Sequence, residues 1–154
     1  MMRKILFMLM LLMSIVARSQ TADALYDEGK KLYDQKKYAL AFKKLLPAAQ
    51  KGHKKAQYRV GRCYDKGHGV AEDNQKAYEW YLKGAQQGHA KSEYQLGRCY
   101  MKGKGCTKDA AKAKSWLLKA VKNPKGGDGV IEKIKEDVAN GDKEAIAIKK
   151  IVGI

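Results

Sequence analysis

Three cysteines are the side chains in this 154-residue sequence best suited to redox, metal or nucleophilic chemistry. Cys63 and Cys99 hold the same place in two similar stretches, GRCYDKGHGV and GRCYMKGKGC. If both stretches are neighbouring helices, these cysteines lie about 8–10 Å apart, beyond the Cα separation of about 7 Å that a disulfide allows. Cys99 and Cys106 are better placed, because a loop after the helix can fold back towards its end. This pair is a candidate disulfide, with buried free thiols as the alternative.

The three histidines are the next candidates, as metal ligands or bases. His53 and His89 occupy equivalent positions in the two similar stretches of chain, too far apart to share one zinc ion with bonds of about 2 Å. His68 stands alone in a glycine-rich segment, and the sequence has no H-E-x-x-H and no C-x-x-C motif. We therefore expect no metal, no other cofactor and no catalytic residue, although a Ser–His–Asp set assembled in space cannot be read from sequence.

The elements that hold these residues follow from a duplication in the chain. Residues 52–83 match residues 88–119 when the second stretch is laid over the first. A fixed period of this length indicates a repeat architecture, so the duplicated residues are predicted to be scaffold. The identical pairs are Gly52/Gly88, His53/His89, Tyr58/Tyr94, Gly61/Gly97, Cys63/Cys99, Tyr64/Tyr100, Gly67/Gly103, Gly69/Gly105, Asp73/Asp109, Ala77/Ala113, Trp80/Trp116 and Leu82/Leu118.

Each repeat is predicted to consist of two helices. In the first repeat, apolar residues recur at helical spacing up to Gly67, which can end the helix in the left-handed conformation. Asp73 can cap the second helix, whose buried face is expected to include Trp80. Gly61 lies inside the first apolar stripe. A mid-helix glycine costs about 1 kcal/mol relative to alanine, so it indicates that another helix packs closely there.

The motif A-x-Y-x-x-G-x-x-Y-x-x-G-x-G-V-x-x-D-x-x-K-A-x-x-W fits residues 56–80 and resembles the Sel1-like repeat, a relative of the tetratricopeptide repeat. The second copy departs from it at Ser92 and Cys106. The resemblance implies an all-α fold in which α/α hairpins stack into a right-handed superhelix, a solenoid. Such solenoids serve as adaptors and scaffolds.

Five segments follow from the repeat pattern and the resemblance. Terminal units of solenoids are atypical, which accounts for the segments on either side of the two repeats. The segments are a signal peptide at 1–19, a tetratricopeptide-like hairpin at 20–51, Sel1-like repeats at 52–87 and 88–123, and C-terminal capping helices at 124–154.

The first nineteen residues have the pattern of a signal peptide. The basic start MMRK precedes the apolar run ILFMLMLLMSIVA, which is short for a membrane span. Ala17 and Ser19 put small residues at the minus-three and minus-one positions of a cleavage site before Gln20. We therefore expect export to the periplasm or beyond the cell, with an uncleaved N-terminal anchor as the alternative.

The chain is strongly basic, with 32 Lys and Arg against 16 Asp and Glu and a net charge of +16. Without Arg3, Lys4 and Arg18, the 29 remaining basic residues still give a net charge near +13. Such a charge favours anionic partners. Export favours an acidic protein or peptide, or anionic envelope surfaces, over nucleic acid. The alternative is a solvated lysine-rich surface that binds nothing.

By analogy with tetratricopeptide hairpins, the first helix of each pair lines the concave face of the solenoid. Residues three or four apart on these helices share one face, where arginine can bind a carboxylate through two N–H groups. Alternatively, Tyr58 and Tyr94 belong to the core. The predicted partner-binding residues are Tyr26, Lys30, Tyr33, Lys55, Tyr58, Arg62, Lys66, Lys91, Tyr94, Arg98 and Lys102.

The function favoured by these observations is an exported adaptor that binds an acidic protein or peptide. Some secreted Sel1-like proteins are described as binding or hydrolysing β-lactams, which makes such chemistry the first alternative. The S-x-x-K motif of serine enzymes is absent, since Ser92 is followed by EYQ and Ser115 by WLLK. Non-specific attachment to anionic envelope surfaces is the second alternative.

Overall fold

The structure, a computed structural model, describes residues 20–154, and the predicted signal peptide lies outside this range. These residues form eight helices and no strand, which confirms the all-α fold class. No helix in this range is long and apolar enough to cross a bilayer. The helices are α2 (Ala22–Asp34), α3 (Tyr38–Gln50), α4 (Lys54–Lys66), α5 (Asn74–Gln86), α6 (Ala90–Lys102), α7 (Ala110–Val121), α8 (Gly127–Ala139) and α9 (Lys143–Val152).

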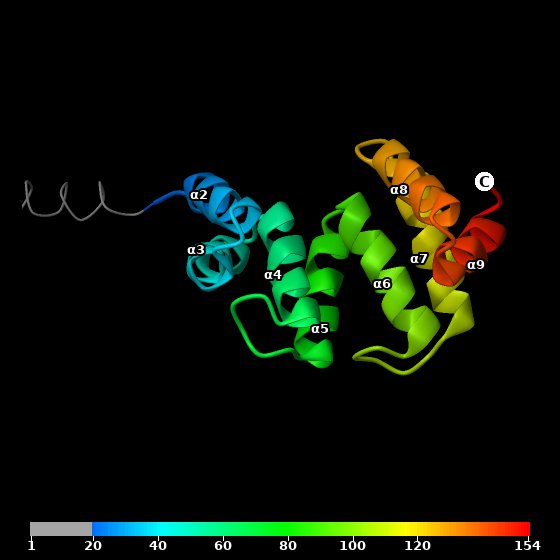
Figure 1. Cartoon of the computed structure of the whole chain (residues 1–154), viewed down its shortest axis with the longest axis horizontal. Helices are drawn as coiled ribbons and strands as arrows, with labels where there is room; N and C mark the ends of the chain where they lie inside the picture. The colour runs from blue at the N-terminus through cyan, green and yellow to red at the C-terminus, as the bar shows by residue number, and fades with distance from the viewer. Residues whose placement is uncertain (1–19) are drawn as a thin grey trace, which may run out of the picture.

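The helices form hairpins that stack along the long axis of the molecule. Contacts are densest within the pairs α2–α3, α4–α5 and α6–α7, and each pair also packs against the next. The loops that join α4 to α5 and α6 to α7 emerge at the same edge (Figure 1). In the last pair, α8 contacts both α6 and α7, while α9 contacts α7. The pair α8–α9 therefore covers the end of the solenoid.

The ends of the repeat helices are set by the glycine and aspartate residues that the two copies share. Gly67 and Gly103 end α4 and α6 in the left-handed conformation, with φ of 65° and 70°. The carboxylates of Asp73 and Asp109 accept a hydrogen bond of 2.9 Å from the backbone N–H three residues later, at the start of α5 and α7. The predicted roles of Gly67 and Asp73 are confirmed.

Within each repeat hairpin, the two helices approach most closely at a glycine. A Cβ atom added to Gly61 in α4 would lie 2.7 Å from the ring of Tyr81 in α5. At Gly97 in α6, an added Cβ would lie 2.7 Å from Cγ of Leu117 in α7. Gly29 in α2 makes the same kind of contact with α3. Tyr81 and Leu117 are among the largest fully buried side chains, so this contact fills the core of each hairpin.

The tryptophans occupy a more peripheral place than the sequence predicts. Trp80 and Trp116 are half-buried rather than buried, because the following residue on each helix, Tyr81 or Leu117, points at the glycine. The ammonium group of Lys83 lies 4.3 Å from the ring centroid of Trp80. The tryptophans thus cover the edge of the core.

Each repeat is closed by an amide side chain at the end of its second helix. Gln87 Nε2 donates to Gln57 Oε1 at 2.7 Å and to the backbone carbonyl of Gly52 at 3.0 Å. Asn123 Nδ2 makes the equivalent bonds, to Glu93 Oε2 at 2.8 Å and to a backbone carbonyl at 3.1 Å. These bonds join the end of each repeat to the start of its first helix.

The close helix contact predicts opposite effects for two glycine-to-alanine changes. Gly97→Ala should lower the free energy of unfolding by about 1–2 kcal/mol, because overpacking outweighs the gain in helix propensity. Gly129→Ala in α8 is the control, since nothing lies within 4 Å of an added Cβ there. It should raise stability by up to about 1 kcal/mol. Urea unfolding measures both, and a stabilising Gly97→Ala change would contradict the close packing.

Candidate functional site

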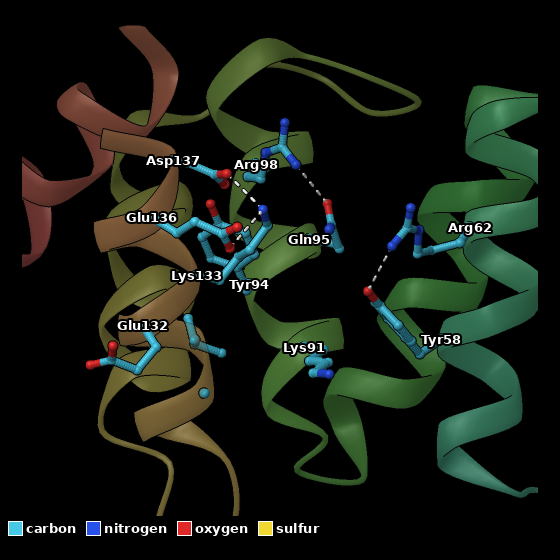
Figure 2. Close-up of a pocket in the computed structure, with 12 residues that line it drawn as sticks. Tyr58, Arg62, Lys91, Tyr94, Gln95, Arg98, Glu132, Lys133, Glu136 and Asp137 are labelled. Atoms are coloured by element: carbon cyan, nitrogen blue, oxygen red, sulfur yellow. Dashed lines mark hydrogen bonds and ion pairs between the residues drawn. The ribbon is translucent and has the colours of Figure 1, made fainter. Parts of the chain in front are cut away.

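Two adjoining pockets open along the first helices of the hairpins. The C-terminal pocket, of about 560 Å³, is lined by α4, α6 and α8 (Figure 2). The N-terminal pocket, of about 470 Å³, is lined by α2, α4, the start of α6 and the segment before α8. Tyr58 and Lys91 line both pockets, which therefore adjoin, and the two pockets together are called the groove below.

The N-terminal pocket has a uniformly cationic lining. No acidic side chain lines it, and burial together with the nearby charges of Lys54, Lys91 and Lys55 lowers the pKa of His89 to about 4. Burial is the largest cause of this low pKa, and the lysine charges act in the same direction; the same charges favour an anionic ligand. The cations that line the pocket are Lys30, Lys54, Lys55, Arg59, Lys91 and Lys125.

Some of these cations are already paired within the chain. Asp34 forms an ion pair with Lys30 at 2.9 Å and with Arg59 at 3.6 Å. The remaining four have no acidic partner within 4 Å among residues 20–154. The pocket therefore keeps most of its positive charge for a ligand.

The C-terminal pocket has two walls of different charge. Arg62, Lys91 and Arg98 come from α4 and α6, whereas α8 contributes carboxylates and a lysine (Figure 2). On α8, Lys133 pairs with Asp137 at 2.6 Å. An acidic ligand is therefore attracted by one wall of this pocket and repelled by the other.

Arg98 and Lys102, both predicted to bind a partner, contact a carboxylate of the capping helices. Arg98 donates from Nε to Glu144 Oε1 at 2.5 Å and from Nη2 to Glu144 Oε2 at 3.1 Å. Lys102 pairs with the same carboxylate. Burial raises the pKa of Glu144, but the hydrogen bonds from Arg98 and Lys102 outweigh it and the pKa is lowered overall. Glu144 therefore attaches α9 to α6.

Of the tyrosines predicted to line the site, two are engaged elsewhere. Tyr94 is 7% exposed and belongs to the core beneath α8, although its edge reaches the C-terminal pocket. Tyr33 lies outside the groove lining and shares a hydrogen bond of 2.8 Å with His68 Nδ1. Tyr26 stacks on His53 with ring centroids 4.3 Å apart, and it lines the N-terminal pocket. Tyr58 is only half-buried.

The other predicted cations divide between the groove and its surroundings. Lys55 and Lys91 line the groove, as does Arg62, whose Nη1 donates to the Tyr58 hydroxyl at 3.5 Å. Lys66 lies outside the two pockets and pairs with Asp65 at 3.6 Å. The structure thus concentrates the predicted site on α4 and the start of α6.

All three cysteines are free thiols in the structure, so the candidate Cys99–Cys106 disulfide is not formed. Cys63 and Cys99 are buried, and burial raises the pKa of each thiol to about 12. Cys106 packs against the apolar cluster that contains Cys99. These thiols are protonated at neutral pH, which makes them poor nucleophiles.

One serine and one histidine lie at the distance expected of a nucleophile and its base. Ser92 Oγ is 2.9 Å from His89 Nδ1. However, Ser92 is fully buried, so its hydroxyl is not accessible to a substrate such as a β-lactam. Among residues 20–154, no group of three or more His, Cys, Asp or Glu side chains is arranged to hold a metal ion.

Comparisons with known proteins agree on the repeats. The Sel1 repeat family model matches residues 54–89 and 90–124. A Sel1 repeat protein from Oxalobacter formigenes is 32% identical with a TM-score of 0.63, and the match covers 82% of this chain and 54% of that one. A protective antigen of uropathogenic Escherichia coli with an SLR fold is 25% identical with a TM-score of 0.66, over 86% of this chain and 30% of that one. The chain thus spans about half of the first structure and under a third of the second. No curated protein matches the sequence significantly.

The Glu144 contact predicts a loss of stability in acid. Because the folded-state pKa of Glu144 lies below its ordinary value of 4.5, its contribution is complete above about pH 4.5 and is lost as the pH falls through the folded-state pKa. Glu144→Gln should cost about 1–3 kcal/mol at pH 7 and remove this part of the pH dependence.

Glu132→Gln is the matched control for that variant. The Glu132 side chain is 72% exposed, and among residues 20–154 its one ion pair is with Lys135, one turn away on the same helix. This change should alter stability by less than about 0.5 kcal/mol. Urea unfolding at several values between pH 7 and pH 3 compares them, and equal pH profiles for the two variants would contradict the role of Glu144.

Proposed function

Because this chain carries two Sel1 repeats and shares the fold of Sel1-repeat proteins, we propose that it is a protein-interaction scaffold whose groove binds an acidic segment of a partner protein. Sel1 repeats generally mediate protein–protein interaction. The observation that carries the finer proposal is the N-terminal pocket, which is lined by six cations and by no acidic residue.

The shape of the groove favours a protein segment over a flat anionic surface. Lys55 and Lys91 lie in a concave pocket of about 470 Å³, a size typical of ligand sites. A bilayer or cell-wall surface contacts projecting charges most readily, whereas an extended acidic chain can enter the depression. The half-buried ring of Tyr58, which lines both pockets, offers apolar contact to such a chain.

The location of the protein is a separate proposal. The basic start, apolar run and small residues within positions 1–19 support cleavage before Gln20 and export to the periplasm or beyond. The partner would then be an exported or envelope protein with an acidic segment.

The proposal predicts that charge reversal in the groove abolishes binding of an acidic peptide. Binding of a fluorescent glutamate-rich peptide is measured at about 0.15 M salt, where exposed charges are largely screened beyond about 8 Å. Lys55→Glu with Lys91→Glu should weaken binding at least tenfold. In the wild type, the bound peptide should also raise the pKa of His89 above about 4, because a negative charge in the pocket favours the protonated ring. NMR titration of the imidazole reports that pKa.

The control reverses the same number of charges away from the groove. Lys43 on α3 and Lys114 on α7 are exposed and have no acidic partner within 4 Å among residues 20–154. Lys43→Glu with Lys114→Glu should change peptide affinity less than threefold. If this control weakens binding as much as the groove variant does, net charge alone drives binding and the groove proposal fails.

A further inference from the structure

The two repeats present the same pair of side chains at the same place in the groove. Tyr58 and Arg62 stand four residues apart on α4, and Tyr94 and Arg98 stand four residues apart on α6. All four line the C-terminal pocket, and both arginines hold the same position in the repeat. The second pair can therefore show what the first pair is built to bind.

The second pair binds a carboxylate. Glu144 of α9 receives two hydrogen bonds from Arg98, one from Nε and one from Nη2. The Arg98 guanidinium lies 5.8 Å from the ring centroid of Tyr94. This is a charge-assisted, two-point contact, the geometry in which arginine binds an oxyanion through two parallel hydrogen bonds. The arginine at this repeat position thus binds a carboxylate within the protein itself.

The first pair has no internal carboxylate. The side-chain contact of Arg62 is the long hydrogen bond to the Tyr58 hydroxyl, and no acidic group lies within 4 Å of its guanidinium among residues 20–154. Figure 2 shows Arg62 and Tyr58 on α4 facing the opposite wall formed by Gln95 and Arg98.

We propose that Arg62, supported by Tyr58, is the carboxylate receptor of the groove and binds an aspartate or glutamate side chain of the partner as Arg98 binds Glu144. The inference rests on the proposed function and deepens it by naming the residue that recognises the acid. Arg98, already bonded to Glu144, is not the receptor in this conformation.

A carboxylate suits this position better than a phosphate does. Arginine binds both groups through two N–H donors, so the guanidinium alone does not decide between them. The same pocket is also lined by Glu132, Glu136 and Asp137 of α8. Their repulsion acts more strongly on a doubly charged phosphate than on a singly charged carboxylate.

The test replaces Arg62 with lysine, which keeps the positive charge but lacks the planar guanidinium that donates two parallel hydrogen bonds. The probe is a fluorescent octapeptide of alternating glutamate and alanine, added to the full-length protein at about 0.15 M salt. Arg62→Lys should weaken binding about tenfold or more. Lys43→Gln on α3, which removes a whole positive charge from an exposed position outside the groove, should change affinity less than threefold. In NMR spectra of the wild type, the Nε–H signal of Arg62 should shift on binding while that of Arg98 does not.

The remaining outcomes separate this inference from the proposed function. Unchanged binding by Arg62→Lys, with binding lost in the Lys55→Glu and Lys91→Glu variant, would overturn the receptor and leave the scaffold proposal intact. No binding of the octapeptide to the wild type would remove both proposals. If inorganic phosphate displaces the peptide at lower concentration than acetate does, the carboxylate assignment is wrong.

Discussion

In each of the first three hairpins, the two helices pack closely at a glycine of the first helix. This short interhelical distance sets the positions of α2, α4 and α6. At Gly61 and Gly97, the side chain that fills the missing Cβ position is fully buried and belongs to the partner helix. A larger residue at either glycine would push the two helices apart. Because neighbouring hairpins pack on one another, a change in one interhelical distance would alter how α2, α4 and α6 line up along the groove.

The distribution of charge in the groove follows from the stacking of the hairpins and from the capping helices α8 and α9. The repeats supply most of the cations, since lysines and arginines recur on α4 and α6 and gather where α4 meets the start of α6. The capping helices supply the acids, through the α8 wall and through Glu144 of α9. Charge therefore changes along the groove, from wholly cationic at the N-terminal pocket to mixed at the C-terminal pocket. A bound segment with an uneven distribution of charge would have a preferred direction.

The fold was predictable because the local sequence features that determine it occur in both repeats. The repeat period, the helix-ending Gly67 and the capping Asp73 are each visible within one repeat, and each has a direct physical reason. The pairing of Arg98 with Glu144 was not predictable, because it joins a repeat to a non-repeated cap 46 residues away. The closing bonds were missed for a different reason. Their residues differ between copies, as Gln57 and Gln87 in one and Glu93 and Asn123 in the other, so a search for identical pairs passes over them although the geometry is shared.

In these closing bonds, the donor and the acceptor belong to the same repeat. The amide at the end of the second helix bonds to a side chain of the first helix and to the carbonyl of the glycine two residues before that helix, both in the same repeat. Duplicating or deleting one whole repeat would therefore keep the donor and acceptor of these bonds together. Bonds that cross a joint, such as that from Gln57 Nε2 to the Ala49 carbonyl, would instead depend on which residue the new neighbour supplies. A change in length by whole repeats thus preserves the closure of each hairpin while it lengthens or shortens the surface that a partner meets.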